Sequence, residues 1–268
     1  MNQTIPLAGP YLSNREHRQL LRDGFVCVKL LSETDILQLK NTYSYNEHKI
    51  RARPFHASMH QTDLVSKKAI DVGIRQVLKE PLKKCIPNYD IVFSNFVVKE
   101  SGNGSEVDMH ADWSYLDENL HASYNVWCTL TEVNELNGCL WVWPGSHKLT
   151  NNVRFTPHVP FSDEDKNLIK SKSIPIPLSA GMGIIYHSGL IHFSKENHSN
   201  STRVASATVL IPSEAKPLHY YKPNLDEALI EVFEVNTLFF LTHSPDKRPT
   251  NCVLRKSIKI DDYSIIVN

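Results

Sequence analysis

Net charge is the first thing that this 268-residue sequence lacks, because 29 lysines and arginines balance 29 aspartates and glutamates. A balanced chain gives no electrostatic reason to expect nucleic acid or an anionic membrane as a partner. No window is apolar over the length that a membrane-spanning helix needs. Met1–Tyr11 also lacks the basic and then apolar pattern of a signal peptide. We therefore expect a cytoplasmic protein with no nucleic-acid or membrane partner.

Closely spaced cysteines are missing too. The sequence has five cysteines: Cys27, Cys85, Cys128, Cys139 and Cys252. Their number is odd, they form no Cys-x-x-Cys pair, and several of them lie within apolar runs. This pattern predicts reduced, buried thiols in a reducing compartment.

The sequence also lacks internal repeats, low-complexity segments and any composition break that would mark a second domain. Its length is within reach of one all-β or mixed domain. We expect a single domain over residues 1–268. It would have a helix-rich part at about 1–88, a β-rich core at about 89–242 and a C-terminal tail at 243–268.

Helical patterns are concentrated in the first third of the chain. Residues 25–30 are rich in β-branched and aromatic types, which predicts one short strand there. Ser32 is followed three residues later by an acidic residue, a helix-start signature that predicts a helix over roughly 33–44. A second helix is expected from about 63 to 84, with a break before Pro81.

From residue 90 onward the sequence favours short strands separated by Gly, Asn, Ser and Pro clusters. Strands are expected at 90–99, 121–132, 139–143, 182–187, 203–211 and 229–241. Many short strands with turn signals between them predict a β-sandwich or a double-sheet jelly roll.

The segment 148–178 is long, polar and proline-containing. Long loops in compact domains often cover a binding site, so one interpretation is a lid. The alternative is a plain insertion at the surface.

Two histidines and a carboxylate form a candidate metal site. His110 and Asp112 are two residues apart, so on a strand both side chains point to the same face and can reach one ion. Asp108 lies on that face as well, and spacing alone does not choose between the two aspartates. His192 follows an apolar strand and offers a third ligand, with His187 as a competitor. Two histidines with one carboxylate are typical of non-heme iron(II) oxygenases, although the same ligands also hold catalytic zinc.

Arg203 stands eleven residues after His192, at the start of an apolar strand. A buried arginine is costly unless it meets an anion, and its guanidinium suits a carboxylate in bidentate geometry. The alternative is an arginine at the exposed end of the strand.

Several motifs in order resemble the phytanoyl-CoA dioxygenase family, and the resemblance runs from about residue 19 to 211. They are His110-Ala111-Asp112, Val126-Trp127, Asn137-Gly138-Cys139-Leu140, Pro144-Gly145-Ser146-His147-Lys148, and the spaced set His192, Ser194 and Arg203. The stretch 132–138 is also similar to the corresponding part of bacterial ectoine hydroxylases. Motifs in this order and spacing are far more specific than His-x-Asp alone.

The resemblance implies a mainly β fold, a cupin-like double-stranded β-helix with N-terminal helices packed on one sheet. It implies iron(II) held by His110, Asp112 and His192, in preference to Asp108 and His187. It further implies 2-oxoglutarate as cosubstrate with O2. The residues implied for the cosubstrate site are Arg203 and Ser194 at its distal carboxylate, Trp127 in the same pocket, and Asn95 near a family position that often carries an amide.

The expected activity is hydroxylation of an unactivated C–H bond in a small molecule, with an amino acid, peptide or natural-product intermediate as the leading substrate class. Trp113 and Tyr115 are candidate walls of the substrate mouth, or alternatively core aromatics. Two other functions stay open. One is a jelly-roll hydrolase or isomerase using zinc or manganese, and the other is a non-catalytic binding module with a vestigial metal site.

Overall fold

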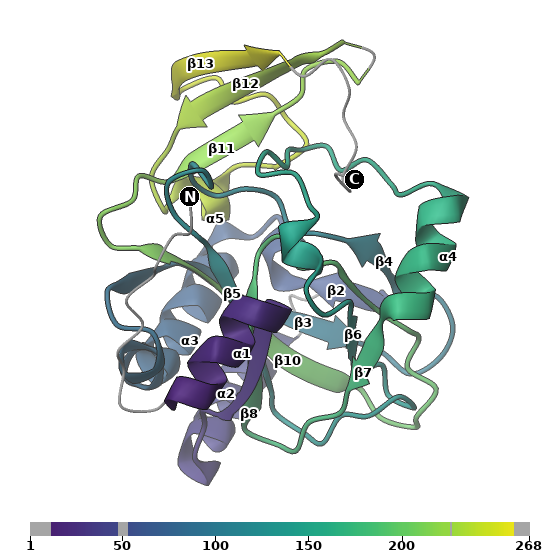
Figure 1. Ribbon diagram of the computed structural model, residues 1–268. Helices are drawn as coiled ribbons and strands as arrows, with labels where there is room; N and C mark the ends of the chain where they lie inside the picture. Colours follow the sequence, from purple (N-terminus) through teal and green to yellow (C-terminus); the bar gives the residue numbers. More distant parts are fainter. Residues whose placement is uncertain (1–11, 48–52, 226, 260–268) are drawn as a thin grey trace.

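The computed structural model describes residues 12–47, 53–225 and 227–259. Two antiparallel sheets face each other, helices cover the outer side of the larger one, and a small third sheet extends from one end (Figure 1). The larger sheet has the order β1 (Phe25–Lys29), β8 (Met182–His187), β5 (Tyr124–Thr129), β10 (Arg203–Pro212), β3 (Tyr89–Lys99) and β2 (Phe55–Ala57). The smaller has β4 (Val107–His110), β9 (His192–Ser194), β6 (Leu140–Val142) and β7 (Ile174–Ile176).

Alternation along the central strands creates two separate apolar layers. Val126 on β5 and Leu210 on β10 belong to the layer beneath the helices, whereas Trp127 and Ala205 belong to the layer between the two sheets. This is the pattern expected when successive side chains of a strand point to opposite faces. The predicted jelly roll, with N-terminal helices packed on one sheet, is confirmed.

The helices that cover the larger sheet come from the N-terminal part of the chain: α1 (Asn14–Asp23), α2 (Glu33–Glu47) and α3 (Leu64–Cys85). Helix α3 packs against β3 and α2. Its residues Ile70, Ile74 and Leu78 are completely buried at helical spacing, so one apolar stripe fixes the helix to the sheet.

The predicted break before Pro81 was wrong, because α3 continues through Pro81 to Cys85. A proline inside a helix removes one backbone hydrogen bond. Leu78, Leu82 and Cys85 on both sides of it are buried, and this packing holds the last turns in place.

The expected strand at 229–241 is shorter than predicted. Strand β12 (Leu229–Glu234) ends early, and the short helix α5 (Phe239–Thr242) follows. Strand β12 lies between β11 (Leu218–Tyr221) and β13 (Val253–Lys259) in the third sheet. Part of the expected C-terminal tail is therefore an ordered strand.

The segment 148–178 contains regular structure. It begins at the end of the 3-10 helix Ser146–Lys148 and includes α4 (Asp163–Lys172) and β7, an edge strand of the smaller sheet. Serine at position 162 caps α4 by accepting a hydrogen bond from the Asp165 backbone. The segment is an ordered arm that reaches the opening between the sheets.

No helix in the described ranges is long and apolar enough to cross a membrane. All five cysteines are free, as predicted; Cys85, Cys128 and Cys139 are buried, whereas Cys27 and Cys252 are half-buried.

Replacing Ile74 with alanine should lower the free energy of unfolding by about 2–4 kcal/mol, because it removes buried methylene and methyl groups and leaves a cavity. Val72→Ala on the same helix is the control, since the Val72 side chain is 50% exposed. Its effect should stay within about 0.5 kcal/mol. Urea unfolding of both variants measures the difference, and equal losses would contradict the packing of α3 described above.

Candidate metal centre and cavity

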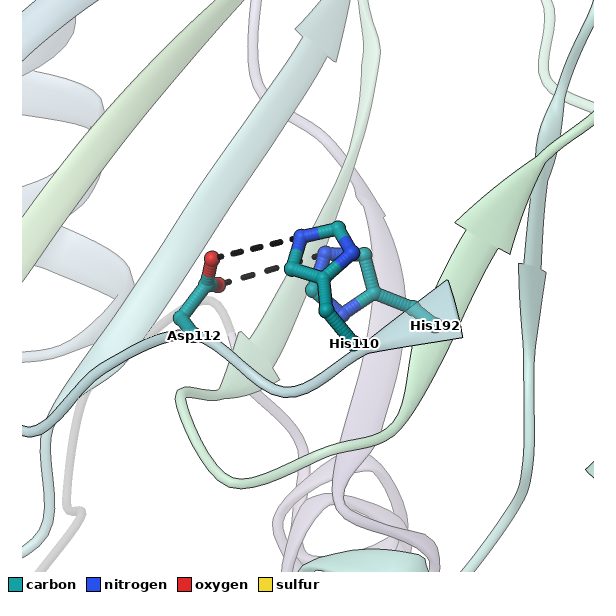
Figure 2. Close-up of side chains that lie close together, drawn as sticks. All are labelled: His110, Asp112 and His192. Atoms are coloured by element: carbon teal, nitrogen blue, oxygen red, sulfur yellow. Dashed lines mark ion pairs between the residues drawn. The ribbon is translucent and has the colours of Figure 1, made fainter. Parts of the chain in front are cut away.

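Strand pairing brings the two candidate histidine ligands together. His110 ends β4, His192 begins β9, and the register of the two strands pairs them directly. Asp112 follows in the chain just beyond β4. One ligand atom from each of these residues lies within 4.8 Å of the others. Figure 2 shows the three side chains converging on one point.

Each imidazole is oriented by a backbone carbonyl two residues earlier in the chain. Nδ1 of His110 is 2.8 Å from the carbonyl oxygen of Asp108, and Nδ1 of His192 is 2.9 Å from that of Leu190. Because a carbonyl oxygen only accepts, both Nδ1 atoms donate to the backbone, which leaves both Nε2 atoms directed at the metal position. Burial, reinforced by the neighbouring His192, lowers the pKa of His110 to about 4. Its ring is therefore neutral near pH 7, as a metal ligand must be.

The Asp112 carboxylate completes the set. Its oxygens lie 3.7 Å from Nε2 of His110 and 4.0 Å from Nε2 of His192. An ion binds such ligands at about 2.0–2.2 Å, so small side-chain movements bring all three into contact with a common metal. The amide of Asn125 donates a 2.9 Å hydrogen bond to Oδ2 of Asp112 and orients the carboxylate. The donor set fits a 2-His-1-carboxylate centre.

Arg154, from the arm, holds the backbone of Asp112. Its Nε donates to the Asp112 carbonyl at 2.5 Å. Its two terminal nitrogens donate to Glu118 at 2.7 and 2.5 Å, and the two side chains are only 4% and 2% exposed. Ser114 exchanges two hydrogen bonds with the backbone of Arg154. These contacts fix the start of the arm, at Arg154, to the metal-ligand segment.

The competing ligands lie elsewhere. The Asp108 carboxylate is largely exposed and is paired with Lys166 of α4 at 2.9 Å. The backbone carbonyl of Asp108 accepts the hydrogen bond from His110. His187 lies beside His147, with tilted rings whose centroids are 5.3 Å apart, and burial lowers the pKa of His187 to about 3. Among the described residues, the ligand atoms that converge are those of the family triad.

A cavity of about 400 Å³ opens beside the triad, between the two sheets. It is lined from the larger sheet by β3, β5 and β10, and from the smaller by β4, β6 and β9. Every other site residue predicted from the sequence lies on its wall: Asn95, Trp113, Tyr115, Trp127, Ser194 and Arg203.

Arg203 is a buried cation without a carboxylate partner in the described ranges. Its side chain lies over the Trp127 ring, 5.1 Å from the centroid, and its Nε makes no hydrogen bond. Burial lowers the pKa of Arg203 to about 9, so the guanidinium stays charged near pH 7. A buried charge of this kind is costly until an anion neutralises it. Arg203 therefore marks the end of the cavity that suits a carboxylate.

Asn95 also presents an unused polar atom. Its amide nitrogen donates to the Ala207 carbonyl at 3.4 Å, whereas its buried Oδ1 has no hydrogen-bond partner. Ser194 lies on β9, two residues after His192, on the same wall. Both are within the cavity that contains Arg203 and Trp127.

Trp113 and Tyr115 combine the two roles considered for them. Tyr115 packs against Phe93 and Phe240, with ring centroids 6.0 and 5.6 Å away, as a core aromatic does. Both residues nevertheless line the cavity. They are packed walls, which gives the cavity a fixed shape on this side.

Three residues that support the site were not predicted from the sequence: Arg154, Glu118 and Asn125. Asn125 precedes Trp127 by two residues on an expected strand, so alternation could have placed it on the same face. No sequence signal identifies the Arg154–Glu118 pair, because its members are far apart in the chain and lie outside any motif.

Arg154→Lys should weaken metal binding about 10- to 100-fold, since a lysine cannot satisfy Glu118 and the Asp112 carbonyl together. Arg248→Lys is the matched control. Arg248 also pairs with a glutamate, Glu231, through two hydrogen bonds of 2.7 and 2.8 Å, but it lies in the half-exposed surface of the third sheet. Titration of both variants with iron(II) under anaerobic conditions measures the effect. A folded Arg154→Lys variant with unchanged affinity would refute the positioning role.

The sequence profile described as phytanoyl-CoA dioxygenase (PhyH) matches residues 21–205. The chain is 27% identical over 220 residues to phytanoyl-CoA dioxygenase 1 of Oryza sativa subsp. japonica, across 77% of this chain and 75% of that protein. It is 30% identical over 127 residues to phytanoyl-CoA dioxygenase of Arabidopsis thaliana, across 46% of this chain and 45% of that protein. The chain thus matches less than half of the length of the Arabidopsis relative.

Solved structures of similar fold include the non-heme, α-ketoglutarate-dependent carbocyclase SnoK from nogalamycin biosynthesis. It is 22% identical with a TM-score of 0.56, covering 80% of this chain and 88% of SnoK. EctD from S. alaskensis, with 2-oxoglutarate and 5-hydroxyectoine, is 17% identical with a TM-score of 0.58, covering 92% and 88%. At these identities the likeness establishes the jelly-roll fold. With the profile matching most of its length, the chain belongs to the phytanoyl-CoA dioxygenase family of iron(II)- and 2-oxoglutarate-dependent oxygenases.

Proposed function

We propose that this protein uses iron(II), 2-oxoglutarate and O2 to hydroxylate an unactivated C–H bond of a small molecule. The observation that carries the proposal is one cavity that contains both elements of such a site. Two imidazoles and a carboxylate converge at its side, and a buried guanidinium lies at its wall with no carboxylate partner among the described residues. The ligand set is that of non-heme iron(II) oxygenases.

His110, Asp112 and His192 would hold the iron. Their Nε2 atoms and carboxylate oxygens face one point, and backbone carbonyls keep the rings in that orientation. The hydrogen bond from Asn125 would keep the Asp112 carboxylate from rotating. When bound, iron(II) supplies the oxidative chemistry, in which 2-oxoglutarate and O2 are consumed and the substrate gains a hydroxyl group.

Arg203 would bind the distal carboxylate of 2-oxoglutarate. A guanidinium recognises a carboxylate with two parallel hydrogen bonds, and the pairing removes the cost of the buried charge. Ser194 would donate a further hydrogen bond, and Trp127 lies beneath the guanidinium and restricts its direction. Asn95 would add its free Oδ1 to the polar wall of the same pocket.

The arm at 148–178 would exclude water from the cavity. Arg154, Phe155, His158 and Val159 of this segment line it. Excluding water protects reactive species and strengthens electrostatic contacts inside a site. That the arm moves on substrate binding stays a prediction, and the Asp108–Lys166 pair is the exposed contact where such movement would begin.

Each of the two rival functions leaves some features of the cavity without a role. A zinc or manganese hydrolase would use the triad but leave Arg203 buried without an anion. A vestigial binding module would need neither the oriented imidazoles nor the Asn125 contact. We favour the cytoplasm as the compartment, and an amino acid, peptide or natural-product intermediate as the broad substrate range.

Anaerobic spectroscopy tests the function directly. The folded protein with iron(II) and 2-oxoglutarate should show a weak visible charge-transfer band, and admission of O2 should release succinate. Iron-loaded, folded protein that shows neither signal would contradict the oxygenase function.

Arg203→Ala should weaken 2-oxoglutarate binding while leaving iron affinity nearly unchanged. Losing one partner of a desolvated charge pair costs about 2–5 kcal/mol, or at least about 30-fold in affinity. The measurement is titration of the charge-transfer band with 2-oxoglutarate. Arg248→Ala, at the surface of the third sheet, controls for the loss of an arginine and should match the wild type. Unchanged 2-oxoglutarate affinity in Arg203→Ala would make that residue merely structural.

A further inference from the structure

The charges around the cavity place a constraint on the substrate. Among the described residues, the lining contains only four side chains that carry a full charge near pH 7: Asp108, Asp112, Arg154 and Arg203. The function proposed above commits Asp112 to the metal and Arg203 to 2-oxoglutarate. Only the charges of Asp108 and Arg154 are then left to interact with the substrate.

The two remaining charges are both neutralised by protein partners. Arg154 is satisfied by Glu118 and by the Asp112 carbonyl, in a pair that is almost completely buried. Asp108 is paired with Lys166 and lies at the exposed rim. Once the cosubstrate is bound, the described wall offers no free cation for a substrate carboxylate and no free anion for a substrate ammonium.

Two histidines of the lining lie outside the triad. Burial lowers the pKa of His60 below its usual value, so its neutral imidazole can form hydrogen bonds but cannot neutralise an acid. The ring of His158 lies edge-on to that of the ligand His110, with centroids 6.1 Å apart, and so stands directly beside the metal centre.

The rest of the wall is apolar and largely aromatic. It includes Phe55, Met59, Phe93, Phe155, Val159 and Val209. The Trp113 indole in this wall lies beside the Tyr115 hydroxyl and adds no charge.

We propose that the part of the substrate enclosed by this cavity is uncharged and mostly apolar. This inference rests on the proposed function, because it assigns Arg203 to 2-oxoglutarate. It disfavours free amino acids within the broader substrate range and favours neutral natural-product-like molecules.

The test uses three probes of similar shape that are small enough to be enclosed: methyl 3-phenylpropanoate, 3-phenylpropanoate and 3-phenylpropylammonium. Calorimetry measures their binding to the anaerobic protein loaded with iron(II) and 2-oxoglutarate. The neutral ester should bind at least about tenfold more tightly than either ion, because burying an unpaired charge is costly. Equal or tighter binding of an ion would overturn the proposal, as would failure of the ester to bind.

Binding of 2-oxoglutarate is measured first in the same preparation, so that failure of the substrate proposal can be told apart from failure of the proposed function. Protein that binds 2-oxoglutarate but prefers a charged probe retains the proposed function and loses only the substrate class. Protein that does not bind 2-oxoglutarate loses the function itself.

Discussion

The pairing of β4 with β9 is the contact on which the site depends. Its register sets His110 opposite His192, so two ligands contributed from points 82 residues apart in the chain meet on neighbouring strands. A register slip of one residue would turn the ligands to the other face of the sheet. The strands are short, and the pairing is supported by β6 on the other side of β9 and by the buried cluster around Ile191 and Phe193.

Two buried arginines near this pair of strands differ in whether their charge is neutralised within the protein. Arg154 has its charge neutralised within the protein by Glu118, and the pair serves to hold the backbone of a ligand. Arg203 has no such carboxylate among the described residues, so its desolvated charge is costly, and binding of an anion would remove that cost. The rigid packing of the first arginine and the unmet demand of the second distinguish a structural ion pair from a binding group.

Sequence reasoning reached the parts of the site that are encoded by local spacing. His110 and Asp112, and the interval from His192 to Arg203, are patterns along the chain, and the alternation of strands explains why they face inward. The resemblance to a family was needed to prefer Asp112 over Asp108, because both point to one face of an ideal strand. The structure separates them because the β4–β9 ladder is irregular between Val107 and His110. The Arg154–Glu118 pair could not be read from the sequence, since tertiary packing alone brings its members together. Tertiary packing also explains why α3 continues through Pro81, although a proline disfavours the interior of a helix.

The orientation of the two imidazoles does not depend on the side chains two residues before them. The acceptors that fix the His110 and His192 rings are main-chain carbonyls, at Asp108 and Leu190, and every amino acid supplies such a carbonyl. Side chains at these two positions can therefore change by mutation without removing the orienting contact. A metal centre built in this way tolerates substitutions in the residues beside its ligands. A new side chain at position 108 could therefore make new contacts at the mouth of the cavity while the geometry of the ligands stays unchanged.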